Sequence, residues 1–102
     1  MSFFTNIFKS KGKEQIATYI KNGALIIDVR TPNEFKSGHI EGSKNYNLSE
    51  IRNNLKAIKK LNKPIVVCCA SGIRSAQAKT ILSSVEIDVI NGGGWRSLKK
   101  YV

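Results

Sequence analysis

Two adjacent cysteines end an apolar stretch in the segment "VVCCASGIRS", residues 66–75. Successive side chains of a strand alternate across it, so Cys68 and Cys69 must point in different directions. Cys68 continues the apolar run that precedes it, and we expect it to be a small buried side chain, a common role for a free cysteine. Cys69 is the last residue before a turn, where its thiolate is a candidate nucleophile.

The turn that follows Cys69 favours a thiolate. Gly72 in "ASGI" permits backbone angles that other residues resist, and a short turn of this kind aims successive N–H groups at one point. A helix beginning near Arg74 adds its partial positive charge. Cysteine pKa values fall from about 8.5 to between about 3.5 and 7.5 in such settings. From position and spacing alone, the alternative is that Cys69 is one more buried residue at a strand end.

The spacing of the two cysteines argues against other cysteine chemistry. Adjacent residues lack the C-x-x-C spacing of zinc sites and thioredoxin-like motifs, and we expect no metal. A disulfide between neighbours needs a strained ring, because consecutive Cα atoms are about 3.8 Å apart and disulfides usually span about 4.4 to 6.8 Å. We therefore expect free, reduced thiols and a cytoplasmic protein.

Composition limits the classes of protein. The 102 residues suit a single domain over residues 1–102, and 41% of them are hydrophobic, which suffices for a core. A formal charge of +10 can attract nucleic acid, anionic membranes or small anionic substrates. The lysines are scattered without interleaved aromatic residues, so we expect no nucleic-acid binding. No stretch reaches the roughly 18 apolar residues of a membrane span.

Apolar periodicity predicts helices and strands in alternation. We expect helices over 11–23, 49–61 and 75–85, a short helix from Thr31, and a last helix after a glycine-rich turn in 92–102. We expect strands over 24–30, 44–47, 63–69 and 87–91. This alternation predicts an α/β fold, a doubly wound parallel sheet of four or five strands with helices on both faces. Ligands of such sheets bind at the carboxyl ends of strands, where "DVR" and "CC" both lie.

Three motifs carry a resemblance to a known family. The segments "DVRTPNEFKSGHIEGSKN", "VVCCASGIRSAQA" and "INGGGW" have the order and spacing of the rhodanese-like domain, in its single-domain sulfurtransferase form. The resemblance implies that Cys69 takes sulfane sulfur as a persulfide from a small anionic donor such as thiosulfate, and that a thiol or cyanide collects it. It implies no metal or organic cofactor. The substrate-binding residues that it implies are Ala70, Ser71, Gly72, Ile73, Arg74 and Ser75.

The length of the loop separates two catalytic classes that share this fold. Related phosphatases have the pattern C-x5-R, whereas Cys69 and Arg74 are spaced as C-x4-R, the shorter sulfurtransferase loop. The resemblance therefore implies sulfur transfer rather than phosphoryl transfer. Ala70 and Ser71 add no cation before Arg74, so we expect weak activity with thiosulfate. The alternative is a sulfur carrier or protein-binding module that exchanges sulfur with a partner protein.

Other residues of the motifs are expected to support the loop. Asp28 and Arg30 resemble the family's "D-x-R", and we expect there a buried or half-buried ion-pair network with Glu34 that holds the loops. His39 is the only histidine and so the only candidate for a Cys-His pair, but the resemblance implies a structural hydrogen-bonding role. Arg74 is expected to bind the anionic donor, the alternative being an ion pair with a carboxylate. Trp95 is expected to cover the core for the last helix, the alternative being that it lines the rim of the site.

The N-terminal segment, residues 1–11, departs from the family pattern because it does not resemble a first strand. Its apolar residues Phe3, Phe4, Ile7 and Phe8 share one face of a helix. Eleven residues fall short of the roughly 12 to 15 that an isolated helix needs. We therefore expect this segment to dock, either on its own domain or on a partner or membrane surface.

Overall fold

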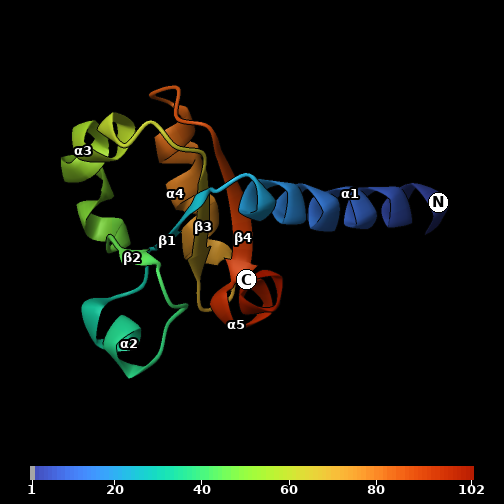
Figure 1. Ribbon diagram of the computed structural model, residues 1–102, viewed down its shortest axis with the longest axis horizontal. Coiled ribbons are helices and arrows are strands. Elements are labelled where there is room, and N and C mark those ends of the chain that lie inside the picture. The colour runs from blue at the N-terminus through green and yellow to red at the C-terminus, as the bar shows by residue number, and fades with distance from the viewer. Residues whose placement is uncertain (1) are drawn as a thin grey trace.

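A parallel sheet of four strands forms the centre of the computed structural model (Figure 1), which describes the backbone of residues 2–102 and the side chains of residues 12–102. The strands are β1 (Leu25–Asp28), β2 (Lys44–Asn45), β3 (Ile65–Cys69) and β4 (Val89–Gly94), and their order across the sheet is β2-β1-β3-β4. All three strand pairs are parallel. The predicted α/β fold is confirmed, with four strands among the described residues.

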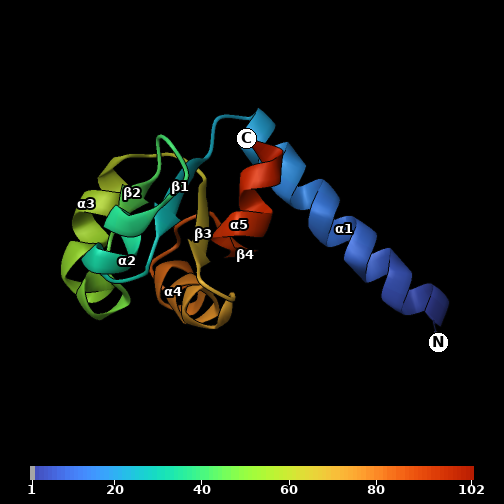
Figure 2. The same cartoon turned by 90° about the horizontal axis from the view of Figure 1, so that it is seen from below.

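Helices cover both faces of this sheet (Figure 2). They are α1 (Ser2–Lys21), α2 (Pro32–Ser37), the 3-10 helix η1 (Leu48–Asn54), α3 (Leu55–Lys60), α4 (Ile73–Ser83), α5 (Trp95–Leu98) and the 3-10 helix η2 (Lys99–Tyr101). One face of β1 and β3 packs on side chains of η1, α3 and α4. The other face packs on side chains of α1 and α5. The sheet therefore has a separate apolar core on each side.

The short helix α2 begins as the sequence predicts. Thr31 is its N-cap and Pro32 follows at the first helical position. The Thr31 side chain accepts a hydrogen bond from the backbone N–H of Glu34, and the Glu34 side chain accepts one from the backbone N–H of Thr31. This capping box satisfies two N–H groups that would otherwise lack a partner. It also fixes the position of the Glu34 carboxylate.

The prediction of one helix over 49–61 was wrong, because this segment is the 3-10 helix η1 followed by α3. Asn54, at the junction, has φ −114° and ψ 10°, which is not α-helical geometry. Its side-chain amide donates a hydrogen bond to the backbone carbonyl of Glu50 at 2.8 Å. Asparagine side chains compete with the backbone in this way, so the regular helix starts only after Asn54.

The predicted glycine-rich turn before the last helix was also wrong, because Gly92 to Gly94 form the end of β4. Glycine is typical of turns, but at this position in the strand it is required by close packing. A Cβ atom on Gly92 would lie 2.7 Å from Cγ1 of Val66 and 3.0 Å from Cδ2 of Leu98. The strand passes so close to the core that no side chain fits at this position.

The N-terminal segment is part of a longer helix than predicted. Helix α1 runs without a break over Ser2–Lys21, which exceeds the length an isolated helix needs. Its N-terminal half extends away from the sheet in both views (Figures 1 and 2). The side chains of Phe3, Phe4, Ile7 and Phe8 lie outside the described residues, so their docking stays a prediction. In the part of the chain that is described, no helix is long and apolar enough to cross a membrane.

Candidate active site at Cys69

Cys69 is the last residue of β3, and the chain curls around its sulfur before α4 begins. The Sγ atom accepts hydrogen bonds from the backbone N–H of Gly72 at 3.0 Å and of Ser75 at 3.4 Å. The Ser75 hydroxyl lies 3.4 Å from the same sulfur. Cys69 is 1% exposed. The loop therefore encloses the sulfur with donors from its turn and from the first turn of α4.

The glycine in this loop has the backbone conformation that the sequence suggests. Gly72 has φ 103° and precedes the first residue of α4, a conformation that residues with a Cβ rarely adopt. A Cβ there would also lie 3.2 Å from Cα of Gly93. Asn91, which the sequence did not indicate as a site residue, links the backbones of Gly72 and Gly93. Its amide donates to the carbonyl of Gly72 at 3.1 Å and accepts from the N–H of Gly93 at 2.9 Å.

The two cysteines lie on opposite faces of the sheet, as predicted from strand alternation. Cys69 belongs to the core on the α4 side and Cys68 to the core on the α5 side. Burial and the nearby Asp28 carboxylate raise the pKa of Cys68 to about 12. Burial acts on Cys69 in the same direction, but hydrogen bonds from Ser75 and Gly72 outweigh it and lower the pKa of Cys69. The environment therefore stabilises a thiolate at Cys69 and not at Cys68.

Removing the hydroxyl of Ser75 should raise the pKa of Cys69. The thiolate forms as pH rises through the pKa, so its ultraviolet absorbance should appear at higher pH in Ser75→Ala than in the parent. The titration is best done in a Cys68→Ala background, which leaves one thiol. Ser84→Ala, a change on an exposed hydroxyl at the other end of α4, is the control. An unchanged midpoint in Ser75→Ala would contradict the role given to this hydroxyl.

Arg74 forms an ion pair with Glu34 at the edge of the loop. Its Nη1 lies 2.7 Å from Oε1 and its Nη2 lies 3.0 Å from Oε2 of the carboxylate. The Arg74 guanidinium lowers the pKa of Glu34 to about 2, so both groups are charged at neutral pH. This pairing is the alternative that the sequence left open for Arg74. The Glu34 carboxylate therefore pairs with Arg74. The expectation that it joins the ion pair of Asp28 and Arg30 was wrong.

Asp28 and Arg30 form a buried ion pair, as expected from "D-x-R". The Arg30 Nη2 lies 2.7 Å from Oδ2 of Asp28, and the side chains are 5% and 0% exposed. The guanidinium also donates to the carbonyls of Glu34 and Gly38, and its Cζ lies 4.7 Å from the centre of the Trp95 ring. The pair thus joins the end of β1 to α2 and to the core under α5. Trp95 is buried there, as predicted.

His39 is held by α2 rather than by the cysteine loop. Its Nδ1 lies 2.7 Å from the carbonyl oxygen of Phe35, and its ring stacks on the ring of Phe35 with centres 3.7 Å apart. None of the hydrogen bonds among residues 12–102 joins His39 to Cys69. The geometry agrees with a structural role and offers no Cys-His pair.

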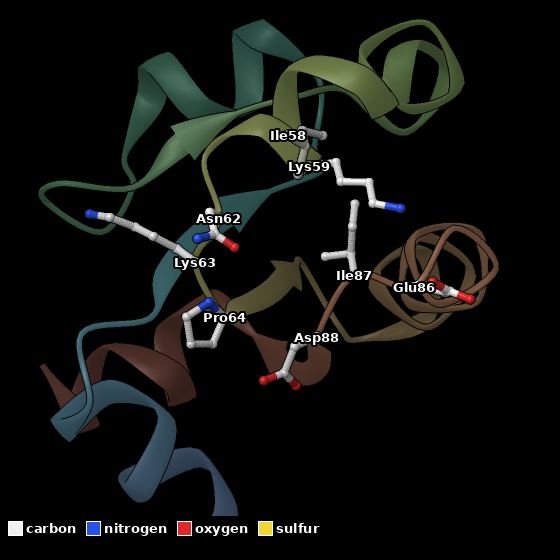
Figure 3. A pocket seen from close by; sticks show the side chains of 8 residues that line it. All are labelled: Ile58, Lys59, Asn62, Lys63, Pro64, Glu86, Ile87 and Asp88. Carbon is white, nitrogen blue, oxygen red and sulfur yellow. The ribbon is translucent and has the colours of Figure 1, made fainter.

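A cavity elsewhere on the surface is not part of this site. It has a volume of about 280 Å³ and is lined by Ile58, Lys59, Asn62, Lys63, Pro64, Glu86, Ile87 and Asp88, as Figure 3 shows. Pro64 and Asp88 precede β3 and β4, so the cavity lies at the amino ends of these strands, whereas Cys69 ends β3. Within residues 12–102 no three His, Cys, Asp or Glu side chains gather closely enough to hold a metal ion.

Known proteins and solved structures similar to this chain include sulfurtransferases and a rhodanese. Uncharacterized protein YqhL of Bacillus subtilis (strain 168) is 38% identical over 73 residues, 69% of this chain and 57% of that protein, so the chain spans little more than half of its length. Thiosulfate sulfurtransferase PspE of Escherichia coli (strain K12) is 35% identical over 74 residues, 71% of each chain. The solved structure of a rhodanese with anions from E. coli superposes with a TM-score of 0.66 at 34% identity, covering 74% of this chain and 91% of that chain.

The family model of the rhodanese-like domain matches residues 12–100. This range contains the whole sheet, the cysteine loop and the two ion pairs described above. The chain therefore belongs to the rhodanese-like domain family.

Proposed function

We propose that this protein is a sulfurtransferase that carries sulfane sulfur as a persulfide on Cys69. The observation that carries the proposal is the set of donors around the Cys69 sulfur, which lowers the pKa of this thiol despite its burial. A thiolate is the nucleophilic form of cysteine. Relatives named thiosulfate sulfurtransferase support the same activity.

The first step loads the cysteine. The Cys69 thiolate attacks the outer sulfur of the donor, and its electron pair forms the new S–S bond. The S–S bond of the donor breaks, and its electron pair leaves with the remainder, which is sulfite when the donor is thiosulfate. No proton or external electron is needed, because the thiolate becomes a persulfide anion. N–H groups of the loop Ala70 to Ser75 stabilise this anion as they stabilise the thiolate.

The second step unloads it. An acceptor, cyanide or a thiolate, attacks the outer sulfur of the persulfide, and the S–S bond to Cys69 breaks. The electron pair of that bond returns to Cys69, which restores the thiolate. The exposed side chains of Ala70, Ser71 and Ile73 surround the path by which donor and acceptor approach. The C-x4-R spacing of Cys69 and Arg74 supports sulfur rather than phosphoryl transfer.

The alternative is a sulfur carrier or protein-binding module with little turnover of its own. The pairing of Arg74 with Glu34 favours it, because a paired arginine is less available to a small dianion such as thiosulfate. Such a carrier would receive sulfur from another enzyme, such as a cysteine desulfurase, and pass it on. The solved structure of reduced Bacillus anthracis CoADR-RHD matches 86% of this chain and 16% of that chain. A domain of this fold can therefore form part of a longer chain, which supports the use of such a domain as a module.

Steady-state kinetics with thiosulfate and cyanide separate the enzyme from the carrier. The enzyme should form thiocyanate with ping-pong kinetics, seen as parallel lines in double-reciprocal plots at several cyanide concentrations. Converging lines would contradict a persulfide intermediate. Negligible turnover together with sulfur uptake from a cysteine desulfurase would favour the carrier.

A further inference from the structure

We propose that Glu34 sets the donor preference of the Cys69 site, making it favour a singly charged donor with an apolar group over the dianion thiosulfate. This inference rests on the proposed sulfur transfer. It adds the class of donor: an organic thiosulfonate or persulfide, in which the group attached to the outer sulfur carries no second charge.

The first support is the charge at the loop. Arg74 is the only charged residue of the segment 70–75, and both of its terminal nitrogens contact the Glu34 carboxylate, at 2.7 and 3.0 Å. The pair of Arg74 and Glu34 therefore carries no net charge. The net charge of +10 attracts any anion from a distance, but this attraction falls off over about 8 Å at physiological ionic strength.

Arg30, on the neighbouring strand end, cannot replace Arg74 as a cation for the donor. It is 4% exposed, and its guanidinium is held by Asp28, by the carbonyls of Glu34 and Gly38, and by the Trp95 ring. A doubly charged donor that binds Arg74 would have to displace Glu34 from it. A singly charged donor needs no such displacement, because hydrogen bonds from the N–H groups of the loop stabilise the negative charge on sulfur.

The second support is an apolar side chain at the same place. Ile73, the first residue of α4 and the neighbour of Arg74, is 71% exposed. One exposed isoleucine is ordinary on a protein surface. Here it lies in the loop that encloses the sulfur, where an apolar group of a donor would cover it and gain free energy from burial.

Two donors of different charge separate this preference. Thiosulfate is a dianion that leaves as sulfite, whereas benzenethiosulfonate is a monoanion with an apolar ring that leaves as benzenesulfinate. In both reactions the Cys69 thiolate bonds to the outer sulfur, and the S–S bond of the donor breaks with its electron pair on the leaving group. The reactions of the two donors therefore make and break the same kinds of bond. They differ only in the charge and the polarity of the group attached to the reacting sulfur.

The matched variant is Glu34→Gln. Glutamine keeps an acceptor oxygen for the capping box with Thr31 but removes the negative charge beside Arg74. Exposed ion pairs contribute up to about 1 kcal/mol, so the kcat/KM for thiosulfate should rise on the order of fivefold, mainly through a lower KM. The kcat/KM for benzenethiosulfonate should stay the same. Thr31→Ala removes the capping hydroxyl and its hydrogen bonds with Glu34, at 3.1 and 3.3 Å, but keeps the negative charge beside Arg74. This variant should therefore keep the parent's ratio between the donors.

Each outcome is decisive. A parent that prefers benzenethiosulfonate, with a preference that falls in Glu34→Gln and persists in Thr31→Ala, supports the inference. Sulfur transfer with an unchanged ratio in Glu34→Gln overturns the inference and leaves the proposed function standing. A loss of preference in Thr31→Ala as well assigns the effect to the shape of α2 and also overturns it. No sulfur uptake by the parent from either donor, measured as intact mass, overturns the proposed function and this inference together.

Discussion

Cys69→Ser should lower the rate of sulfur transfer by about a thousandfold or more, the scale of loss seen when a catalytic nucleophile is removed. A serine hydroxyl forms no S–S bond, and its alkoxide is not populated at neutral pH. The donors that now stabilise the thiolate, from Gly72 and Ser75, would still be present around the serine oxygen. The loss would therefore report the missing sulfur and not a collapsed loop. The measurement is the formation of thiocyanate from thiosulfate and cyanide.

Cys68→Ala is the control that the chain itself supplies. Cys68 is the neighbour of Cys69 but lies in the core on the other face of the sheet, where burial holds the pKa of its thiol at about 12. This variant should keep its turnover, and circular dichroism should show the parent's fold. A large loss in Cys68→Ala with the fold intact, or turnover in Cys69→Ser, would contradict the division of roles between the two cysteines.

Arg30→Met should destabilise the fold by about 3 to 5 kcal/mol, because it leaves a buried carboxylate without its partner. Asp28 is 0% exposed, and the nitrogens of Arg30 contact both of its side-chain oxygens. Methionine has a similar length, so the change removes the charge and its hydrogen bonds more than the volume. The free energy of unfolding, measured with urea, gives the size of the effect.

Arg74→Met is the matched control for this loss of stability, because it makes the same substitution in an ion pair that is partly exposed instead of buried. The side chains of Arg74 and Glu34 are 35% and 36% exposed, and solvent-exposed pairs are usually worth under about 1 kcal/mol. Its unfolding free energy should therefore stay within about 1 kcal/mol of the parent's. Equal losses in the two variants would contradict the structural role given to Asp28 and Arg30.

Much of the fold follows from local patterns in the sequence. The apolar runs that end at Asp28 and Cys69 are buried strands of the sheet, and Thr31 caps a short helix with Pro32 at its first position. The alternation of side chains in a strand separates Cys68 from Cys69 without further information. Gly72 was expected to take a backbone angle that favours glycine, and it does. These features depend on neighbours in the sequence, which is why the sequence predicts them.

One error, the single helix predicted over 49–61, has a local cause in the contact of Asn54 with Glu50. Other errors and omissions depend on contacts between distant segments. Gly92 looks like a turn residue, but its contacts with Val66 and Leu98 make it part of a strand. The pairing of Glu34 with Arg74 joins residues 40 positions apart, and the contact of Asn91 with Gly72 joins residues 19 positions apart. No local pattern selects Arg74 over Arg30 as the partner of Glu34. The sheet decides it, because β1 and β3 are neighbours and their ends lie together.

The central claim is that Cys69 carries sulfur as a persulfide, and intact mass spectrometry tests it most directly. The parent and Cys68→Ala, each incubated with a panel of sulfur donors that includes thiosulfate and benzenethiosulfonate, should gain the mass of one sulfur atom. Cyanide should remove that gain, and Cys69→Ser should never acquire it. A parent that gains no sulfur from any donor, or a gain that persists in Cys69→Ser, would contradict the account.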